Sequence, residues 1–442
     1  MFKKNLFLFK ISEKLESFFV LLCLFIFIFL WSFADGFNLR LSIVFPAILI
    51  VYKIFKKELN LRIFYFSLFI VFVCLLHLII SYANLSEGLM SSYSLTSNFK
   101  PILSIFVISL VVSQYYDLLI KNLKKIINIY MVVFLIDIIF GTFANIENIK
   151  NDQNLKLSNL FFNCDNGLVS YVGRIVKENS HMAMISVPII LSGIVNKNFF
   201  KNNLISYIFS IFFIFNYITY STTFNVGIVL SSILVIIFLI HKKEFKFSYF
   251  FFLLMVVSIL ILLNDKSCKL KTSQTFKIAI DISFNLKKKE TNLTSDINLE
   301  KKERINLTSD VHHNAFLVAK HSLIETNFIG LGLDNYAVGH EYFKNRFVVE
   351  LSNPTAAILN NRDASSNLIK IISEFGIFIA FPIILFLYFI FSSKEDLHTS
   401  IFLIAVIVVQ LIRGAGYFNG GFALFSLMIC YSVFYKLKKK SD

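Results

Sequence analysis

The sequence predicts an all-α, polytopic integral membrane protein with about twelve transmembrane helices. Hydrophobic residues make up 56% of the 442 residues, and phenylalanine alone supplies 53 of them. Apolar runs of the length needed to cross a bilayer recur along the whole chain. Short clusters of lysine and arginine fall between alternate runs, where the positive-inside rule places cytoplasmic loops. We therefore interpret the formal charge of +15 as a topology signal and not as a nucleic-acid-binding surface.

Residues 1–264 are predicted to form the first nine transmembrane helices, joined by short loops. Lysines at positions 3, 4, 10 and 14 precede the first apolar run and place the amino terminus in the cytoplasm. No small-residue cleavage site follows that run, so it is predicted to be a retained span. The predicted spans are residues 17–34, 38–55, 63–82, 99–115, 126–144, 178–196, 204–220, 222–241 and 247–264.

A large periplasmic loop, residues 265–365, is predicted to follow, and residues 366–442 then supply the last three spans and a basic cytoplasmic tail. Within the loop, a charged insert at about 285–310 contains a partly repeated sequence and has the composition of a flexible, solvated segment. Residues 311–324 regain an apolar period, which predicts an amphipathic helix lying on the outer membrane surface. The last three spans are residues 366–392, 398–414 and 418–436.

The five cysteines have no metal-binding spacing, and no metal or other cofactor is predicted. Cys164 and Cys268 both fall in predicted extracytoplasmic loops, so the predicted topology allows a disulfide between them. Nothing in the sequence fixes the distance between them.

The first polar cluster lies at the outer mouth of the sixth predicted span. Arg174, Glu178 and His181 are spaced so that a helix would place them on one face, and Lys177 lies beside them. Such a face can bind a phosphate through its cations and accept a proton through Glu178 or His181. The alternative is an interfacial helix end with an ordinary i,i+4 ion pair.

A second cluster of polar residues begins at the mouth of the tenth predicted span and continues two turns into it. Its members are Arg362, Asp363, Ser366, Asn367, Lys370 and Glu374. An ion pair inside a bilayer must face protein or water, which favours a functional cavity at this point. The alternative is that Lys370 and Glu374 only lock two helices together. Arg346 in the large loop and Arg413 at the end of the eleventh span are further cations.

Three stretches carry a family resemblance: Arg174 with Glu178-Asn-Ser-His181, then Thr219-Tyr-Ser221-Thr222, and finally Gly330-Leu-Gly332 with Ser366-Asn367 and Glu374-Phe-Gly376. In this order they resemble the motifs of the O-antigen ligase/polymerase superfamily of bacterial polysaccharide assembly. The predicted layout of the spans and the long loop is similar as well. Three positions depart from the pattern: Asn179 stands where many polymerases have proline, Thr222 stands where many members have arginine, and Ser366 stands where ligases have histidine.

The resemblance implies a C-type glycosyltransferase-like fold in the bacterial inner membrane, with both termini cytoplasmic and the active face periplasmic. It implies a polymerase that transfers the growing glycan from polyprenyl diphosphate to a new lipid-linked repeat unit, without a metal. Ser366 favours this reading over a ligase acting on lipid A-core; a flippase of lipid-linked oligosaccharides is the other alternative. Partners would be polyprenyl-diphosphate-linked oligosaccharides, membrane lipid and a chain-length regulator protein, and no nucleic acid.

The same resemblance assigns roles to the two clusters. Catalytic roles are expected of Glu178, His181 and Glu374. Binding of the diphosphate or glycan is expected of Arg174, Lys177, Arg346, Arg362, Asp363, Ser366, Asn367, Lys370 and Arg413.

Overall fold

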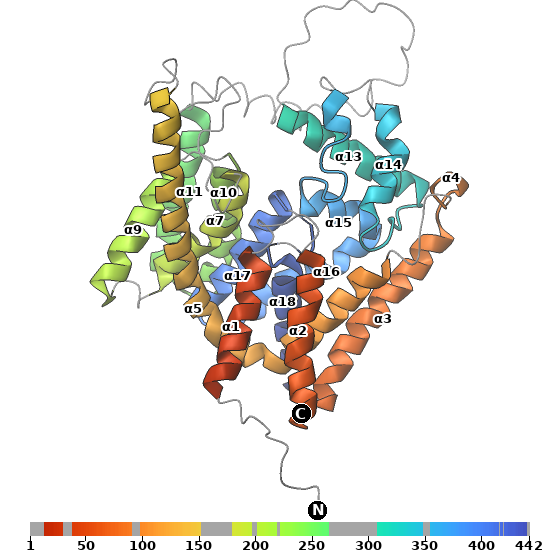
Figure 1. Cartoon of the computed structure of the whole chain (residues 1–442), viewed down its shortest axis with the longest axis horizontal. Helices are drawn as coiled ribbons and strands as arrows, with labels where there is room; N and C mark the ends of the chain where they lie inside the picture. The colour runs from red at the N-terminus through yellow and green to blue at the C-terminus, as the bar shows by residue number, and fades with distance from the viewer. Residues whose placement is uncertain are drawn as a thin grey trace, which may run out of the picture.

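The computed structural model describes residues 13–29, 38–90, 98–151, 179–196, 201–218, 222–264, 307–347, 354–414, 416–418 and 420–439. Every regular element in these ranges is a helix, which confirms the all-α prediction (Figure 1). The helices are α1 (Glu13–Phe29), α2 (Asn38–Phe55), α3 (Leu61–Ala83), α4 (Glu87–Met90), α5 (Phe99–Asn151), α7 (Asn179–Val195), α9 (Asn203–Ile218), α10 (Thr222–His241), α11 (Phe245–Asn264), α13 (Leu307–Glu325), α14 (Tyr336–Phe347), η5 (Pro354–Ala357), α15 (Asn367–Phe375), η6 (Gly376–Ile379), α16 (Ala380–Ser392), α17 (Leu397–Ile412) and α18 (Phe422–Lys439).

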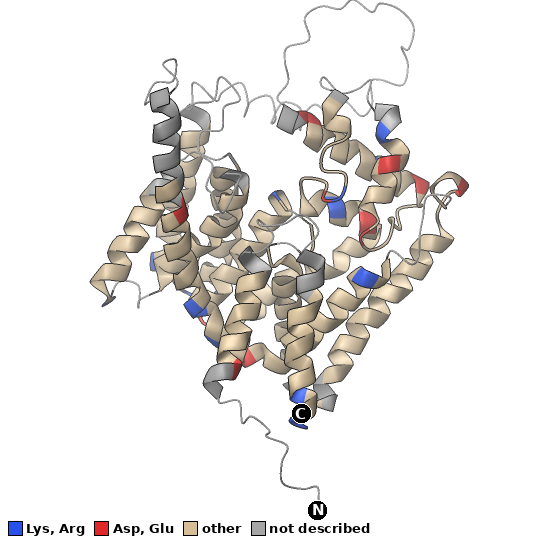
Figure 2. Ribbon diagram, viewed as in Figure 1, with Lys and Arg blue, Asp and Glu red and all other residues tan. Residues whose placement is uncertain are grey.

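Among the described residues, five helical segments are long and apolar enough to cross a membrane. They are Phe64–Ala83, Phe99–Asp137, Thr223–His241, Phe245–Leu262 and Asn367–Ser392. Shorter apolar helices, including most of α1, α2, α7, α9, α17 and α18, pack with them. Most of the helix surface between the two ends of the bundle carries no charge (Figure 2). The helices thus have the composition that a membrane requires, and the number of crossings stays a prediction.

The fourth and fifth predicted spans belong to one element, α5, which bends at Tyr115. Tyr115 has non-helical backbone angles (φ −123°, ψ 17°), and the two arms of α5 point in different directions (Figure 1). The basic stretch 121–125, expected in a loop, is instead helical. No glycine or proline occurs between residues 102 and 140, so nothing in this segment forces the helix to end.

The tenth predicted span is divided into α15, η6 and α16 rather than forming one continuous helix. The division falls at Gly376, whose backbone (φ 51°, ψ −130°) is accessible to glycine and strained for other residues. This interruption turns α15 away from α16 and lets its amino-terminal half join the polar part of the structure.

The helix predicted at 311–324 exists as α13, its residues are divided between protein contacts and exposed positions, and its placement on the membrane surface stays a prediction. Val318 and Ala319 are buried against the protein, whereas Phe316 and Ile324, expected on the same apolar face, are exposed. The helix packs on α14, α15 and η5, and these elements cover apolar residues of α13 such as Val311, Ala315 and Val318. We call α13, α14, η5 and α15 the cap.

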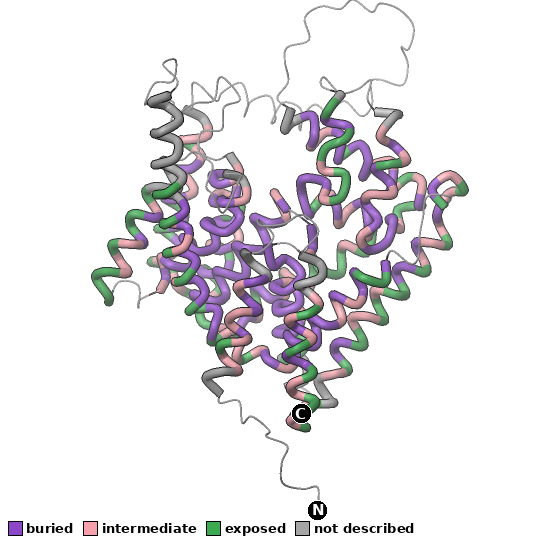
Figure 3. The backbone as a smooth tube through the Cα atoms, in the orientation of Figure 1, coloured by how far each residue is buried: buried purple, intermediate pink, exposed green. Residues whose placement is uncertain are grey.

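Helix α17 lies at the centre of the bundle. Every residue from His398 to Gln410 is buried, and α17 contacts α7, α10, α15 and α18 (Figure 3). A methyl group added at Gly227 of α10 would touch both Val409 of α17 and Val187 of α7. Lys242, just after α10, donates to Ser393 O, just before α17, and Lys243 lines a pocket together with Ile194 at the end of α7. The end of α7 therefore lies toward the start of α17, and the start of α7 lies toward the end of α17, which is the cap end. The start of α1 and the end of α18 lie at the opposite end (Figure 1).

Candidate functional site

The turn that follows α13 docks on the end of α15. Backbone N–H groups of Leu331 and Gly332 donate to the carbonyls of Ser373 (3.0 Å) and Glu374 (2.8 Å), and the N–H of Ile377 donates to Phe328 O (2.9 Å). The two halves of the predicted Gly-x-Gly and Glu-x-Gly pattern, more than forty residues apart, are therefore in direct contact.

The carboxylate of Glu374 joins three parts of this structure. It is fully buried. Its Oε1 accepts a hydrogen bond from Tyr336 N (2.9 Å), and its Oε2 accepts from Asp334 N (2.8 Å) and Tyr417 Oη (2.5 Å). Because these donors come from the turn before α14 and from the turn after α17, the carboxylate ties both turns to α15. The hydrogen bonds of Glu374 are with the protein itself, and the catalytic role expected of it stays a prediction.

Lys370 is likewise occupied within the protein. Its ammonium group donates to Asp334 Oδ1 (2.6 Å) and to Arg362 O (2.9 Å), and it lies 3.8 Å from Glu374 Oε1. It also lies 4.7 Å from the centre of the Tyr417 ring. Only 4% of the side chain is exposed, so it does not present its charge to a diphosphate outside. The predicted pair Lys370–Glu374 lies within α15, and it is the pair Lys370–Asp334 that joins α15 to the turn before α14; the substrate-binding role of Lys370 stays a prediction.

Ser366 and Asn367 anchor the start of α15 to the end of α17. Ser366 caps α15, accepting from Ile369 N, and its hydroxyl donates to Leu411 O (2.8 Å). Asn367 is fully buried and its Oδ1 accepts from Gly416 N (3.2 Å). These hydrogen bonds join the start of α15 to the backbone at and just after the end of α17, and the substrate binding expected of the two residues stays a prediction.

The loop 358–365 presents the charged groups of the second cluster that reach the surface. Arg362 is exposed and Asp363 is partly exposed, with Asp363 Oδ1 accepting from Ser365 N (3.2 Å). Arg413, half-buried, donates from Nη1 to Ser365 O (3.1 Å). Arg413, at the end of α17, is thus hydrogen-bonded to the loop 358–365, which carries the exposed Arg362 at the cap end of the bundle.

His312 on α13 is a residue of this region that the sequence analysis does not include among the site residues. Burial, together with the positive charge of Arg413, lowers the pKa of His312 to about 4. The imidazole is therefore neutral near pH 7 and is a weak proton acceptor. The signal that could have found it is its position at the start of the helix that precedes the Gly-x-Gly turn.

The first polar cluster is described only in part. Arg174, Lys177 and Glu178 lie outside the described residues, as do Cys164, Cys268 and the stretch 219–221. His181 lies in the first turn of α7, half-buried, at the same end of the bundle as Arg413. Arg346 is in the last turn of α14, and its side chain is not described.

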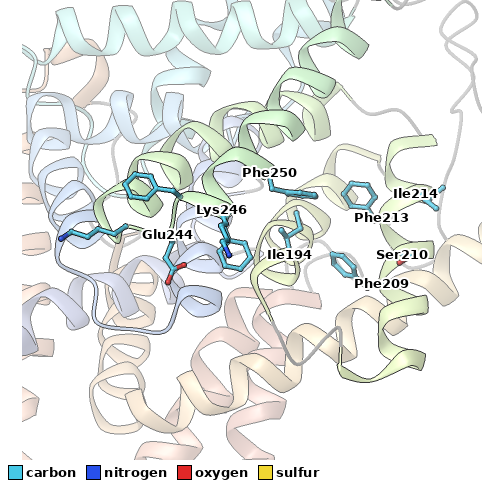
Figure 4. A pocket seen from close by; sticks show the side chains of 11 residues that line it. Ile194, Phe209, Ser210, Phe213, Ile214, Glu244, Lys246 and Phe250 are labelled. Carbon is cyan, nitrogen blue, oxygen red and sulfur yellow. The ribbon is translucent and has the colours of Figure 1, made fainter.

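Two lateral grooves are candidates for a lipid tail. The larger, about 1180 Å³, lies between α7, α9 and α11, with Phe209, Phe213 and Phe250 along it (Figure 4). It also reaches the α10–α11 turn at Lys243, so it lies toward the end away from the cap. A narrower groove of about 100 Å³ runs between α15–α16 and α17–α18 and begins at Leu368, in the first turn of α15.

Among the described residues, no group of three or more histidine, cysteine, aspartate or glutamate side chains is placed to hold a metal ion. Comparison of the chain with protein-family models, curated proteins and solved structures finds no match.

Proposed function

We propose that this protein is an integral membrane glycosyltransferase that polymerises lipid-linked oligosaccharide repeat units. It transfers the growing glycan from polyprenyl diphosphate to a new lipid-linked unit at the outer, periplasmic face of the bacterial inner membrane. In this proposal the chain crosses the membrane about twelve times with both termini in the cytoplasm, and the cap faces the periplasm.

The observation that carries the proposal is the hydrogen bond between Arg413, at the end of α17, and the loop 358–365 that carries the exposed Arg362, at one end of an apolar helix bundle. A lipid diphosphate leaving group develops negative charge at the membrane surface, and guanidinium groups stabilise it without a metal. His181, at the same end of the bundle, is a candidate for accepting the proton of the acceptor hydroxyl. In this proposal four buried residues of α15 and its N-cap hold the loop 358–365 and the end of α17 in place: Ser366, Asn367, Lys370 and Glu374.

The groove that begins at Leu368 supports a lipid-linked donor. It is lined by apolar side chains of α16, α17 and α18, such as Ile383, Leu411 and Phe422. A polyprenyl tail lying there would place its diphosphate at the end of α17, where Arg413 lies.

A transporter of lipid-linked oligosaccharides is a second candidate, favoured by one observation. Asn367–Ser392, an apolar segment long enough to cross a membrane, is interrupted at Gly376, and interrupted helices are typical of transporter binding sites. A flippase and a polymerase act on the same lipid-linked units, so they are separated by where these units accumulate.

Replacing Arg362 by alanine in the native host should leave single capped repeat units and remove long chains from the polysaccharide ladder. Loss of a charge-assisted hydrogen bond to phosphate should lower elongation by about 10- to 100-fold. The Arg362→Lys variant keeps the charge without the bidentate geometry and should be intermediate. Lys320→Ala, a cation of the cap on α13, is the matched control and should keep the ladder.

Three other outcomes contradict the polymerase. An unchanged ladder in an Arg362→Ala variant expressed at normal levels would show that Arg362 does not bind the diphosphate, and would contradict the proposed site. Lipid-linked units retained on the cytoplasmic side would indicate a flippase. Long chains that accumulate on the lipid diphosphate without reaching their final acceptor would indicate a ligase.

Filling the narrow groove should weaken binding of the lipid-linked donor. Ile383 lines this groove, while its neighbour Ile384 does not and is 62% exposed. Ile383→Trp should raise the KM for the donor about tenfold, which corresponds to the loss of about two buried methylene groups, and leave kcat unchanged. Ile384→Trp is the control. Steady-state kinetics in reconstituted vesicles measure both, and equal KM values for the two variants would exclude this groove as the tail site.

A further inference from the structure

A polar cavity of about 1070 Å³ lies at the end of the bundle opposite the cap, between α1, α2, α5, α16 and α18. Its size is at the upper end of the range of ligand sites, roughly 300–1,000 Å³. Five tyrosines line it: Tyr115, Tyr116, Tyr388, Tyr431 and Tyr435. Cations and carboxylates also line it in equal number, namely Lys53, Lys121, Lys394, Glu16, Asp117 and Glu395.

The bend of α5 builds one wall of this cavity. At the bend, Tyr115 Oη donates to Leu49 O (2.9 Å), and Lys53 Nζ donates to Gln114 O (2.7 Å). The ammonium of Lys53 also lies 4.3 Å from the centre of the Tyr115 ring. These contacts hold α2 against the bend of α5. The ammonium of Lys53 interacts with Gln114 O and the Tyr115 ring, which belong to the wall itself.

The remaining charges of the cavity are placed for a ligand that carries both signs. Lys121 and Lys394 are exposed, as is Asp117. Glu395 is half-buried, and its Oε1 accepts a hydrogen bond from Tyr116 Oη (3.0 Å). A purely anionic ligand would meet the carboxylates as well as the lysines, so the cavity favours a zwitterion.

The rim of the cavity carries aromatic side chains suited to a membrane interface. Phe391 and Tyr435 line the cavity and are 47% and 52% exposed. They belong to α16 and α18, which lie among the apolar helices. Aromatic side chains concentrate at the level of lipid head groups, so this rim fits the depth at which a phospholipid head group lies.

We propose that this cavity binds a glycerophospholipid whose head group contains a phosphate and a primary ammonium, as in phosphatidylethanolamine. The phosphate is bound by Lys121 and Lys394. The ammonium donates to Asp117 and Glu395 and lies against the tyrosine rings. A choline head group lacks the N–H donors that the two carboxylates accept, and a glycerol head group lacks the positive charge. This site is independent of the transfer proposed at the cap end.

The experiment measures lipid binding to the full-length protein by native mass spectrometry in detergent. The probes are dioleoyl phosphatidylethanolamine, phosphatidylglycerol, phosphatidylcholine and soluble glycerophosphoethanolamine. Phosphatidylethanolamine should bind at least fivefold more tightly than the other three. Glu395→Gln and Asp117→Asn should each weaken its binding about fivefold to tenfold, as expected for the loss of one charge-assisted hydrogen bond near the surface.

Glu58→Gln and Lys57→Gln are the control variants, since both residues are exposed in the turn after α2 and neither lines the cavity. They should leave binding unchanged. Equal binding of phosphatidylglycerol or phosphatidylcholine would overturn the proposal, as would unchanged phosphatidylethanolamine binding by Asp117→Asn, an exposed substitution that should not disturb folding. If soluble glycerophosphoethanolamine binds as tightly as phosphatidylethanolamine, the acyl chains contribute nothing to binding, and the ligand of the cavity is a soluble molecule and not a lipid.

Discussion

Replacing Gly376 by alanine should detach the cap from the helix bundle. A Cβ atom at this position would lie 2.0 Å from Phe328 O and 2.6 Å from the carbonyl carbon of Ile329, and both are backbone atoms that cannot move aside alone. The backbone angles of Gly376 add strain of their own, because φ is 51° and ψ is −130°. Together these effects should cost about 3–5 kcal/mol, since steric overlap and backbone strain both contribute.

Gly416→Ala is the matched control for this substitution. Gly416 also has a positive φ, 91°, but no atom lies within 4 Å of the position its Cβ would occupy. Alanine there should cost only the strain of the left-handed backbone, about 1–2 kcal/mol. Thermal unfolding in detergent, with limited proteolysis of the turn 326–335, measures both variants. Similar losses in the two would mean that the contact of Gly376 with the α13 turn does not hold the cap in place.

The close contact at Gly376 also shows why the sequence could locate these segments but not their roles. Apolar runs long enough for a membrane predicted the helices, because a helix is the only open-ended structure that satisfies its backbone in lipid. The fourth predicted span ends at residue 115, where α5 bends, but the sequence did not predict that the helix continues through the basic residues 121–125, because charged residues between apolar runs are typical of a loop. The break at Gly376 was missed because its cause is a contact with Phe328, nearly fifty residues away.

The same limit applies to the polar residues. Charge and helical spacing correctly grouped Asn367, Lys370 and Glu374 on one side of α15, where all three are buried. Spacing does not reveal whether a buried polar face meets substrate or protein. Asp334, which pairs with Lys370, lies in a turn where no periodicity operates, so the sequence reasoning did not include it among the site residues.

Changing Glu374 to glutamine should destabilise the cap by about 2–4 kcal/mol, because the buried carboxylate accepts three hydrogen bonds and faces a buried ammonium. A glutamine amide has one oxygen, so its NH₂ group would meet at least one N–H or O–H donor. Lys370 would also lose one of its two carboxylate neighbours. Denaturant unfolding with the tyrosine signal of the cap, or proteolysis of residues 326–335, measures the loss.

A double-mutant cycle distinguishes this positioning role from the catalytic role that the sequence predicted for Glu374. Lys370→Met in the Glu374→Gln background removes the buried charge that the first change left underpaired. The pair should therefore show a coupling of about 1–3 kcal/mol, with the double variant more stable than the sum of the two single changes. Loss of glycan transfer should then follow the loss of cap stability. A catalytic Glu374 would give the opposite pattern. The Glu374→Gln variant would be as stable as the parent, and glycan transfer would fall about 10²- to 10⁴-fold. Adding Lys370→Met would not restore transfer.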